Sequence, residues 1–351
     1  MIYDLLRDEI KGFKNYEVSN IECKYKMDAN EVPFSLPEST LENLQEIVKS
    51  ANVNRYPDPV SIKLRDKLAE KCSASKDNIL VGNGSDEIIH IIMNAFVSPD
   101  DFVVYPVPSF SMYRVYSEIA GANKVEVSLG EDYHYDVVEF IKSIKEYDPK
   151  LVILCNPNNP TGTTISRDDI IKILEVNRGI TVVDEAYYEF FGETVIDLIN
   201  KYKNMIVLRT LSKAYGLAGL RVGYAVSNPE MIGCLNLVKS PYNVNSISQA
   251  IALSVLEADT VKDRVEYIKN ERKFLMDGLS KIDGLKVYNS QANFLLLKFD
   301  DADYVYNKLL EKGILVRDFS GDNELSGTLR VTIGTREANN YFIKCIKEIL
   351  S

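Results

Sequence analysis

The feature that most constrains the fold is a repeated alternation between short apolar runs and segments with helical periodicity. Between residues 60 and 226 the apolar runs are nearly continuous in Val, Ile and Leu, and amphipathic stretches separate them. Strands of this kind are typical of a sheet whose two faces are both covered by helices. The sequence therefore predicts an α/β fold with a largely parallel sheet. We expect strands at 79–81, 102–105, 124–129, 151–155, 180–183, 205–209 and 221–226, and helices at 60–72, 85–97, 137–147 and 167–176.

The pattern changes near Pro241, and this change predicts a second, smaller unit. With 351 residues the chain is long for a single hydrophobic core. A long helical stretch over 246–279 is followed by strand-like runs at 285–288, 294–299, 314–317 and 329–333, and by a closing helix at 337–350. We expect an N-terminal arm over 1–37, a large domain over 38–240 and a small α+β domain over 241–351.

Composition argues against several classes of function. The 41 basic and 51 acidic residues give a formal net charge of −10 without any basic stretch, so the chain would repel a nucleic-acid backbone. No run approaches the ~18 apolar residues of a membrane span, and the N-terminus mixes acids and bases, unlike a signal peptide. Five scattered cysteines lack any Cys-x-x-Cys spacing, which argues against disulfides and zinc. We expect a cytoplasmic protein with no metal, nucleic-acid or membrane partner.

The histidine count limits the choice of a catalytic base. Only His90 and His134 are present, the first in an apolar helical pattern and the second in a loop-like segment. Neither has the neighbours that a serine–histidine triad or a two-histidine zinc motif requires. If the chain is an enzyme, we expect another residue type to act as its base.

Polar residues follow three of the predicted strands, at the edge where ligands bind in open parallel sheets. Asn159 lies in the Asn-Pro-Asn-Asn-Pro-Thr-Gly run after 151–155, Asp184 and Tyr187 follow 180–183, and Lys213 follows 205–209. Singly, these residues fit ordinary turns, strand ends and a solvated lysine. Together they suggest pyridoxal phosphate, because a lysine amine can hold an aldehyde as a Schiff base and an acid can keep a pyridine nitrogen protonated.

A second group of residues is suited to a phosphate. The run Gly82-Asn-Gly-Ser85-Asp86-Glu87 passes from a strand into a helix, whose free amides and positive end favour an anion. Ser85 is also a good N-cap residue, so capping alone could explain this composition. Further phosphate donors near the lysine are Thr210, Ser212 and Arg221. Phe110 could lie flat on a cofactor ring, although an aromatic residue after a strand is more often part of a core.

Taken in order, the motifs resemble those of the histidinol-phosphate aminotransferase family, within the fold-type I pyridoxal-phosphate-dependent aminotransferases. The resemblance spans nearly the whole chain. One departure is Phe110, where many members carry tyrosine, so that ring stacking is kept but a hydroxyl contact is lost. The matching segments are Asp28-Ala-Asn30-Glu31-Val-Pro33, Arg55-Tyr56-Pro57-Asp58, Gly82 to Glu87, Pro157-Asn-Asn159-Pro-Thr-Gly162, Asp184-Glu-Ala-Tyr187, Ser212-Lys213, Arg221-Val-Gly-Tyr224 and Leu329-Arg330-Val-Thr-Ile-Gly334.

The resemblance implies a role for each of these residues. Lys213 would anchor the cofactor and move the substrate proton, while Asp184 would pair with the ring nitrogen. Asn159 and Tyr187 would bind the ring 3-oxygen. Tyr56 would reach the cofactor phosphate of the neighbouring subunit, which implies a homodimer with shared active sites. The implied phosphate contacts are Ser85, Asp86, Thr210, Ser212 and Arg221, the implied ring contact is Phe110, and the implied substrate contacts are Arg330, Arg317, Asn30 and Tyr16.

The activity implied by the resemblance is amino-group transfer between histidinol phosphate and 2-oxoglutarate, in histidine biosynthesis. The same core would also serve an aromatic or other amino-acid aminotransferase, or a threonine-phosphate decarboxylase. A non-catalytic pyridoxal-binding regulator normally needs an attached DNA-binding domain, and the arm is too short and too acidic for one. A nicotinamide-dependent dehydrogenase is disfavoured because no Gly-x-Gly-x-x-Gly follows the first strand.

Overall fold

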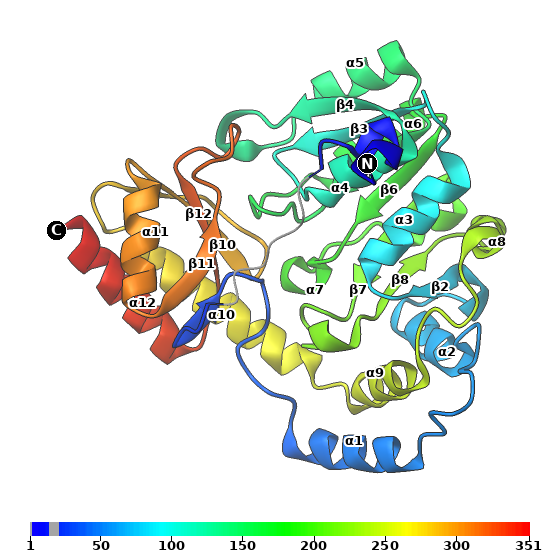
Figure 1. The fold of residues 1–351 in the computed structure, drawn as a ribbon, viewed down its shortest axis with the longest axis horizontal. Coiled ribbons are helices and arrows are strands. Elements are labelled where there is room, and N and C mark those ends of the chain that lie inside the picture. Colours follow the sequence, from blue (N-terminus) through cyan, green and yellow to red (C-terminus); the bar gives the residue numbers. More distant parts are fainter. Residues whose placement is uncertain (1, 14–20) are drawn as a thin grey trace.

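The computed structural model describes residues 2–13 and 21–351, and its core contains a seven-stranded sheet. Helices cover both faces of this sheet, as the alternating sequence pattern predicts (Figure 1). The strand order is β2 (Ile79–Gly82), β8 (Gly223–Val226), β7 (Met205–Thr210), β6 (Ile180–Asp184), β5 (Leu151–Cys155), β3 (Phe102–Val107) and β4 (Asn123–Ser128).

The five strands from β7 to β4 are parallel, but β8 is antiparallel to both of its neighbours. A parallel connection needs a crossover of a dozen or more residues, usually a helix. Between β7 and β8 the chain forms only a short 3-10 turn, η6 (Ala218–Leu220), so it returns along the strand it has just left. The expectation of a largely parallel sheet is confirmed, with the exception of β8, the second strand from one edge.

The two faces of the large sheet bury different helices. One face packs against α3 (Ser85–Phe96), α4 (Met112–Ala120) and α8 (Pro229–Val238). Neighbouring residues of a strand point to opposite faces, so Leu151 and Ile153 lie in one core and Val152 and Leu154 in the other. The opposite face packs against α2 (Ile62–Lys71), α5 (Val137–Tyr147), α6 (Arg167–Val176), α7 (Tyr188–Phe191) and α9 (Ser246–Ala258).

A second sheet of five strands lies beside the first (Figure 1). Its outermost strand, β1, comes from the arm and pairs in parallel with β11. The arm therefore contributes to the smaller unit instead of only extending along the surface. The strand order is β1 (Tyr25–Met27), β11 (Ile314–Asp318), β12 (Thr328–Thr332), β10 (Phe294–Phe299) and β9 (Leu285–Val287), with helices α10 (Val261–Leu279), α11 (Ala302–Glu311) and α12 (Arg336–Leu350).

The helical stretch expected over 246–279 is two helices. Helix α9 ends at Ala258, where Asp259 takes a left-handed conformation with φ 48°, and α10 begins at Val261. A left-handed residue after the last turn ends a helix, and aspartate tolerates this conformation better than most residues. Four helices that the sequence reading did not identify are α1 (Glu38–Ser50), α4, α7 and α8.

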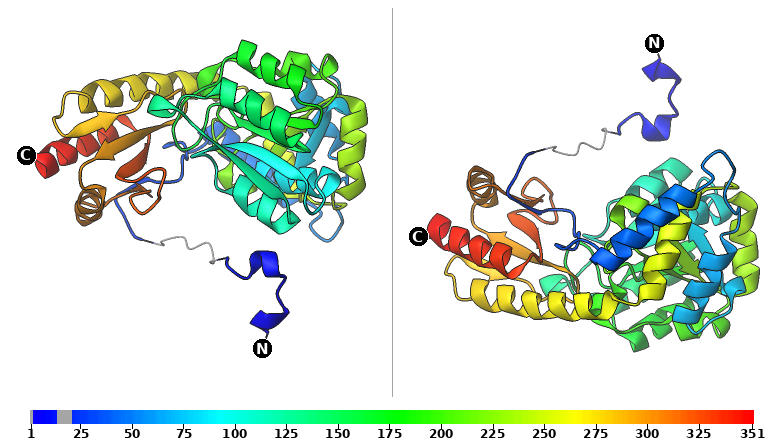
Figure 2. Two further views of the ribbon diagram at one scale, coloured as in Figure 1. Left: turned by 90° about the horizontal axis from the view of Figure 1, so that it is seen from above. Right: turned by 90° about the horizontal axis from the view of Figure 1, so that it is seen from below.

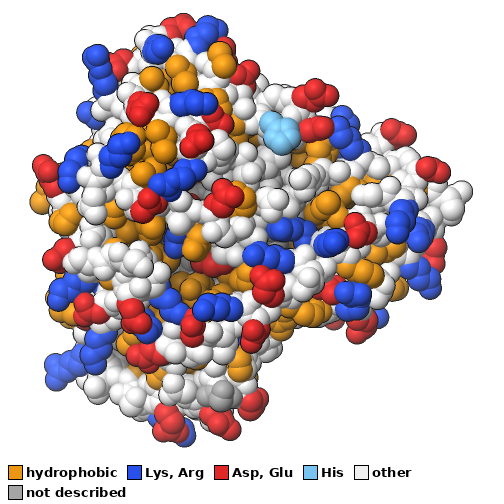
Figure 3. Space-filling model, turned by 180° about the vertical axis from the view of Figure 1, so that it is seen from behind, with side chains coloured by type: hydrophobic (Ala, Val, Ile, Leu, Met, Phe, Trp, Pro, Cys, Tyr) orange, Lys and Arg blue, Asp and Glu red, His pale blue; other side chains and the backbone are white. Residues whose placement is uncertain are grey.

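The two ends of the chain lie far apart (Figure 2). Helix α12 ends beside the small sheet, whereas η2 (Asp8–Ile10), which follows the short turn η1 (Tyr3–Leu5), contacts α4. There the Arg7 guanidinium donates to the carbonyl of Ile119 at 2.8 Å. Within residues 2–13 and 21–351, no helix is long and apolar enough to cross a membrane. Basic and acidic side chains are interspersed over the face seen in Figure 3.

Candidate active site

The predicted residues Asn159, Asp184 and Lys213 follow three adjacent strands of the large sheet. Cys155 at the end of β5 is in register with Asp184 at the end of β6, and Asp184 is in register with Leu208 of β7. The amide of Asn156 donates to the carbonyl of Asp184 at 2.9 Å, which extends the ladder past β5. The parallel register therefore places these polar groups at one edge of the sheet, as the sequence predicts.

Asp184 is a buried carboxylate with two hydrogen-bond donors. Its Oδ2 accepts from the Tyr113 hydroxyl at 2.7 Å, and its Oδ1 accepts from the Ala186 amide at 3.1 Å. Burial raises the pKa of Asp184 to about 6, although the two hydrogen bonds oppose this shift. A buried acid of this kind gains from a cation placed beside it, because the charge would offset the cost of burial.

Sequence reasoning missed Tyr113, which holds Asp184 from helix α4. Its ring is fully buried and lies edge-on to Phe110, with the ring centroids 5.6 Å apart. Phe110 thus belongs to the same aromatic group as the residue that binds Asp184. The available signal was the spacing of the two aromatic residues three positions apart, which places both on one side of a helical turn.

The Lys213 amine points towards the arm. Its Nζ donates to the carbonyl of Ala29 at 3.0 Å and lies 5.9 Å from the centre of the Tyr187 ring. Burial, reinforced by the positive charge of Arg330, lowers the pKa of Lys213 to about 8. The amine of a solvated lysine is almost fully protonated near neutral pH. A larger fraction of the Lys213 amine is neutral there, and the neutral amine is the nucleophile.

Asn30 brings the arm into contact with Tyr187. The Asn30 side-chain amide donates to the Tyr187 hydroxyl at 2.9 Å, and its backbone amide donates to Thr332 Oγ1 at 2.9 Å. Asn30 is buried and has a positive φ of 55°, a conformation that asparagine adopts more readily than most residues. Burial raises the pKa of Tyr187 to about 12, so this hydroxyl keeps its proton near neutral pH.

The two arginines expected at the substrate lie in different environments. Arg330 on β12 is buried, and its guanidinium donates to Asn159 Oδ1 and, at 2.6 Å, to the carbonyl of Asp28. Arg317 on β11 is in register with Arg330. However, the Arg317 side chain is exposed, with its guanidinium 5.7 Å from the centre of the Phe319 ring. The structure joins Arg330 to the strand-end residues and leaves Arg317 at the surface.

The start of helix α3 forms a narrow cradle beside Arg221. Gly84, with φ 85°, is the N-cap residue and Ser85 is the first helical residue, so Ser85 is not the cap that its residue type suggested. A Cβ on Gly84 would lie 2.7 Å from the Arg221 guanidinium, and one on Gly223 would lie 2.3 Å from the Ser85 amide. Only glycine fits at these two places, which brings the helix amides close to Arg221.

The charges and hydroxyls of this cradle fit an anion. Arg221 Nη2 bonds Asp86 Oδ2 at 2.8 Å, and the amides of the first helical turn have no partner within the helix. Thr210 ends β7 nearby and Ser212 follows it, and Thr210 Oγ1 accepts from the Ser212 amide at 3.1 Å. The residues present therefore fit a phosphate group, and the neighbouring Lys213, Asp184 and Phe110 fit the ring of a pyridoxal cofactor.

Two predicted residues are not placed at this site within the chain. Tyr56 is 82% exposed, and its ring stacks on that of Tyr242, with the centroids 4.6 Å apart. Tyr16 lies outside the described residues. Among residues 2–13 and 21–351 there is no group of three or more His, Cys, Asp and Glu side chains that could hold a metal ion.

The family model for aminotransferase class I and II matches residues 23–346. The matched range includes both sheets and the candidate-site residues from Asn30 to Arg330. The chain therefore belongs to the aminotransferase class I and II family.

Similar proteins point to one branch of this family. The chain is 62% identical over 350 residues to the histidinol-phosphate aminotransferase of Thermoanaerobacter sp. (strain X514), with 100% of each chain covered. It is 60% identical over 351 residues to the protein of the same name from Caldanaerobacter subterraneus subsp. tengcongensis, again with complete coverage. The similarity runs through the N-terminal arm and both sheets.

Solved structures share the fold. The histidinol-phosphate aminotransferase from Clostridium acetobutylicum matches with a TM-score of 0.85 and 27% identity, over 93% of this chain and 98% of that one. An L-threonine-O-3-phosphate decarboxylase from Porphyromonas gingivalis matches with a TM-score of 0.79 and 25% identity, over 93% and 99%. Fold alone thus spans two chemistries, whereas the high sequence identity is to aminotransferases.

Proposed function

We propose that the chain catalyses pyridoxal-phosphate-dependent transamination between L-histidinol phosphate and 2-oxoglutarate, giving imidazole acetol phosphate and L-glutamate. The observation that carries this proposal is the 62% identity, over the full length of both chains, to a histidinol-phosphate aminotransferase. The buried group of Lys213, Asp184 and Asn159 at the strand ends supplies the chemistry that such a reaction needs.

The cofactor would be held by residues from several elements. When bound, pyridoxal phosphate supplies an electron-withdrawing ring that stabilises negative charge on the substrate carbon. Lys213 would attach it, Asp184 would face its ring nitrogen, and Asn159 and Tyr187 would donate to its 3-oxygen. Phe110 would lie against the ring. Its phosphate would contact Ser85, Asp86, Thr210, Ser212 and Arg221. We expect the amide of Asp86 to contribute this contact, because its carboxylate would repel an anion.

Lys213 and Asp184 would carry out the two charge-dependent tasks. With a pKa of about 8, the Lys213 amine can accept and return a proton near neutral pH, as a general base must. Asp184 is buried and would gain by pairing with a protonated ring nitrogen, because an opposite charge within about 4–6 Å favours the charged form of both groups. The surroundings of each residue therefore favour the role proposed for it.

Substrate anions would be bound by Arg330, with Asn30 and Arg317 as further contacts and Tyr16 as a residue of the arm. Arg330 is fixed by Asn159 and Asp28, so its guanidinium is oriented before an anion arrives. The anion would be the phosphate of histidinol phosphate or the carboxylate of glutamate. An arginine held in this way favours a bidentate contact with either group.

The working assembly would be a cytoplasmic homodimer with shared sites. Tyr56 supports this proposal because its side chain is largely exposed and stacks on Tyr242 at the surface of its own subunit. In a dimer it would contact the cofactor phosphate of the neighbouring subunit. The division into an arm over 1–37, a large domain over 38–240 and a small domain over 241–351 stays a prediction.

Absorbance and a substrate panel test the proposal. Adding pyridoxal phosphate to the purified chain should produce a visible band. Borohydride should abolish this band and leave the cofactor covalently attached to Lys213. The loaded enzyme should then prefer histidinol phosphate with 2-oxoglutarate over aromatic amino acids, and should release no carbon dioxide from threonine phosphate. A chain that gives no such band would refute the cofactor, and a preference for an aromatic amino acid would favour the alternative aminotransferase.

A further inference from the structure

Glu185 and Arg209 form a buried ion pair that has no part in the roles described so far. Arg209 Nη2 lies 2.8 Å and its Nε 3.0 Å from Glu185 Oε2, and the two side chains are 5% and 1% exposed. Removing charges from water is costly, and such a pair rarely contributes more stability than well-packed apolar residues. A buried pair beside the candidate site therefore calls for a role beyond stability.

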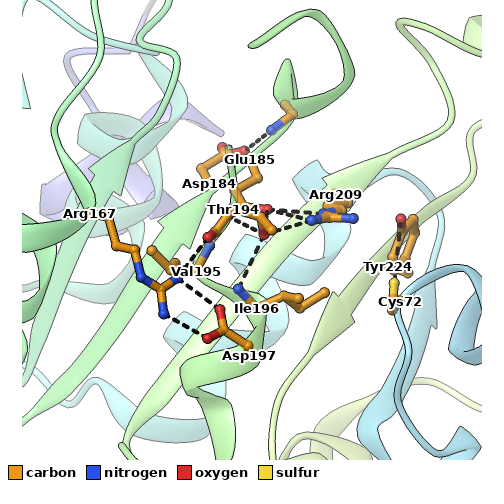
Figure 4. Close-up of polar contacts among 11 residues, drawn as sticks. Cys72, Arg167, Asp184, Glu185, Thr194, Val195, Ile196, Asp197, Arg209 and Tyr224 are labelled. Carbon is orange, nitrogen blue, oxygen red and sulfur yellow. Dashed lines mark hydrogen bonds and ion pairs between the residues drawn. The ribbon is translucent and has the colours of Figure 1, made fainter. Parts of the chain in front are cut away.

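The pair joins β6, which ends at Asp184, to β7, which precedes Lys213. Glu185 directly follows β6, and its amide donates to Leu208 of β7 at 2.9 Å. Successive residues of a strand point to opposite faces, so Asp184 turns to Tyr113 while Glu185 turns to Arg209. Figure 4 shows the contact between Glu185 and Arg209. Arg209 is the residue before Thr210, the last of β7. The ion pair thus fixes the end of β6 against the end of β7, on the side opposite to the Asp184 side chain.

Arg209 also holds the segment beyond Asp184. Its guanidinium carbon lies 3.6 Å from the centre of the Tyr188 ring, so Arg209 contacts residues on both sides of Tyr187. Its Nη2 donates to Thr194 Oγ1 at 2.7 Å. The carboxylate of Glu185 accepts from Thr194 Oγ1 and from the Val195 amide at 2.9 Å, which closes the cluster (Figure 4).

We infer that Glu185 and Arg209 are positioning residues that set Asp184 and Tyr187 at a fixed distance from Lys213. Neither residue touches the reacting atoms. The inference rests on the proposed function, because it concerns the geometry of the cofactor's partners. A misplacement of about 1 Å from a distant substitution can lower a rate about 10²-fold. Losing this pair should therefore lower kcat more than it alters KM.

The central variant is Arg209→Gln, studied as the pyridoxal-phosphate-loaded enzyme. We expect kcat to fall about ten- to a hundred-fold with KM changed less than about threefold. The visible band should remain, but its pH titration midpoint should move by about half a unit, because Asp184 and Tyr187, which would face the bound cofactor, would shift in position relative to it. A purely structural role would lower stability and leave this midpoint in place.

The chain offers a matched control in a second arginine pair. Arg167 Nη2 lies 2.6 Å from Asp197 Oδ2, and Arg167 Nη1 donates to the carbonyl of Thr194 at 2.9 Å (Figure 4). This pair reaches the same loop but is 38% and 63% exposed and does not join β6 to β7. Arg167→Gln should therefore keep the midpoint and kcat of the unmodified enzyme.

Two conservative variants keep the test decisive if Arg209→Gln does not fold. Arg209→Lys keeps the charge but loses the fork that contacts Glu185 twice, so it should restore kcat only in part. Glu185→Gln keeps the shape and removes the charge. If these folded variants show the midpoint and kcat of the unmodified enzyme, the positioning role is wrong. If the unmodified chain itself gives no visible band with pyridoxal phosphate, the proposed function fails instead.

Discussion

Two regions supply the groups of the candidate site, and they are built in different ways. In the first region, Asn159, Asp184 and Lys213 follow neighbouring parallel strands, so the sheet register brings them together. In the second region, Asn30 and Arg330 come from the arm and the small sheet, and they reach the first through single hydrogen bonds to Tyr187 and Asn159. The first region depends on local topology, whereas the second depends on how distant parts of the chain pack.

This difference predicts that the two regions fail in different ways. Changes among the strand-end residues should reduce the chemical step, because these groups would act on the cofactor itself. Changes in residues from outside the strand-end group, such as Asn30 and Arg330, should mainly reduce ligand binding, since those groups would close the site around its ligands.

The largest effect is expected for Lys213→Ala. Transamination should fall more than about 10³-fold, because the variant loses both the covalent attachment and the proton carrier. Pyridoxal phosphate should still bind noncovalently through the phosphate and ring contacts, which equilibrium dialysis can measure. Activity within a few-fold of the unmodified enzyme would remove Lys213 from the mechanism.

Asp184→Asn should have the next largest effect. The change keeps size and polarity but removes the charge proposed to protonate the ring nitrogen, so the single-turnover rate with glutamate should fall about 10²-fold. Stopped-flow absorbance of the loaded enzyme measures this rate. An unchanged rate would mean that Asp184 serves only as a strand end, and that the first region is less catalytic than we propose.

Tyr56→Phe tests another residue from outside the strand-end group, one that would act across the proposed dimer. Loss of one hydrogen bond to a charged group costs about 1.5–3 kcal/mol, which corresponds to a roughly ten- to hundred-fold weaker affinity for pyridoxal phosphate. The rate at saturating cofactor should change little. A drop in the saturated rate as large as that of Asp184→Asn would break the distinction between the two regions.

Mixed dimers decide which subunit Tyr56 serves. A heterodimer of Tyr56→Phe and Lys213→Ala protomers would have one intact site and one site lacking both groups, if Tyr56 acts across the interface. It should then show about half the activity per dimer with the ordinary cofactor affinity. If the competent lysine instead shows the weakened affinity, Tyr56 acts within its own subunit.

The two regions also differ in how far the sequence predicts them. Asp184 and Lys213 could be placed from the sequence because Asp184 ends one apolar strand and Lys213 comes soon after another, and parallel strands end at one edge. Tyr113 could not, since its contact with Asp184 depends on how helix α4 packs on the sheet. The contact of Asn30 with Tyr187 spans 157 residues, and no local pattern indicates it.

Some elements of the fold could not be predicted from local sequence patterns either. The strands of the large sheet were predicted from their apolar runs, but the reversed direction of β8 depends on a short connection that forms no crossover helix. Strand β1 is three residues long and becomes a strand by pairing with β11, almost 300 residues further along the chain. Such elements are set by tertiary contacts, which local periodicity does not record.

The smallest effect concerns stability in the cofactor-free chain. Burial raises the pKa of Asp184 from 3.8 to about 6, so the folded chain holds this proton more tightly than the unfolded chain. Stability from this group is therefore fully present below pH 3.8 and is lost as pH rises through about 6. Between pH 5 and 7, this loss amounts to about 1 kcal/mol.

Asp184→Asn should remove that loss, because asparagine does not titrate. Urea unfolding at pH 5 and pH 7 should show the unmodified chain losing about 1 kcal/mol more than the variant over this interval. The absolute stabilities do not decide the question, since the variant also exchanges one hydrogen-bond acceptor for a donor beside Tyr113 and Ala186. Equal pH dependence in the two proteins would show that burial does not raise the pKa of Asp184 in the folded chain. The contrast between the two regions would then rest on the kinetic measurements alone.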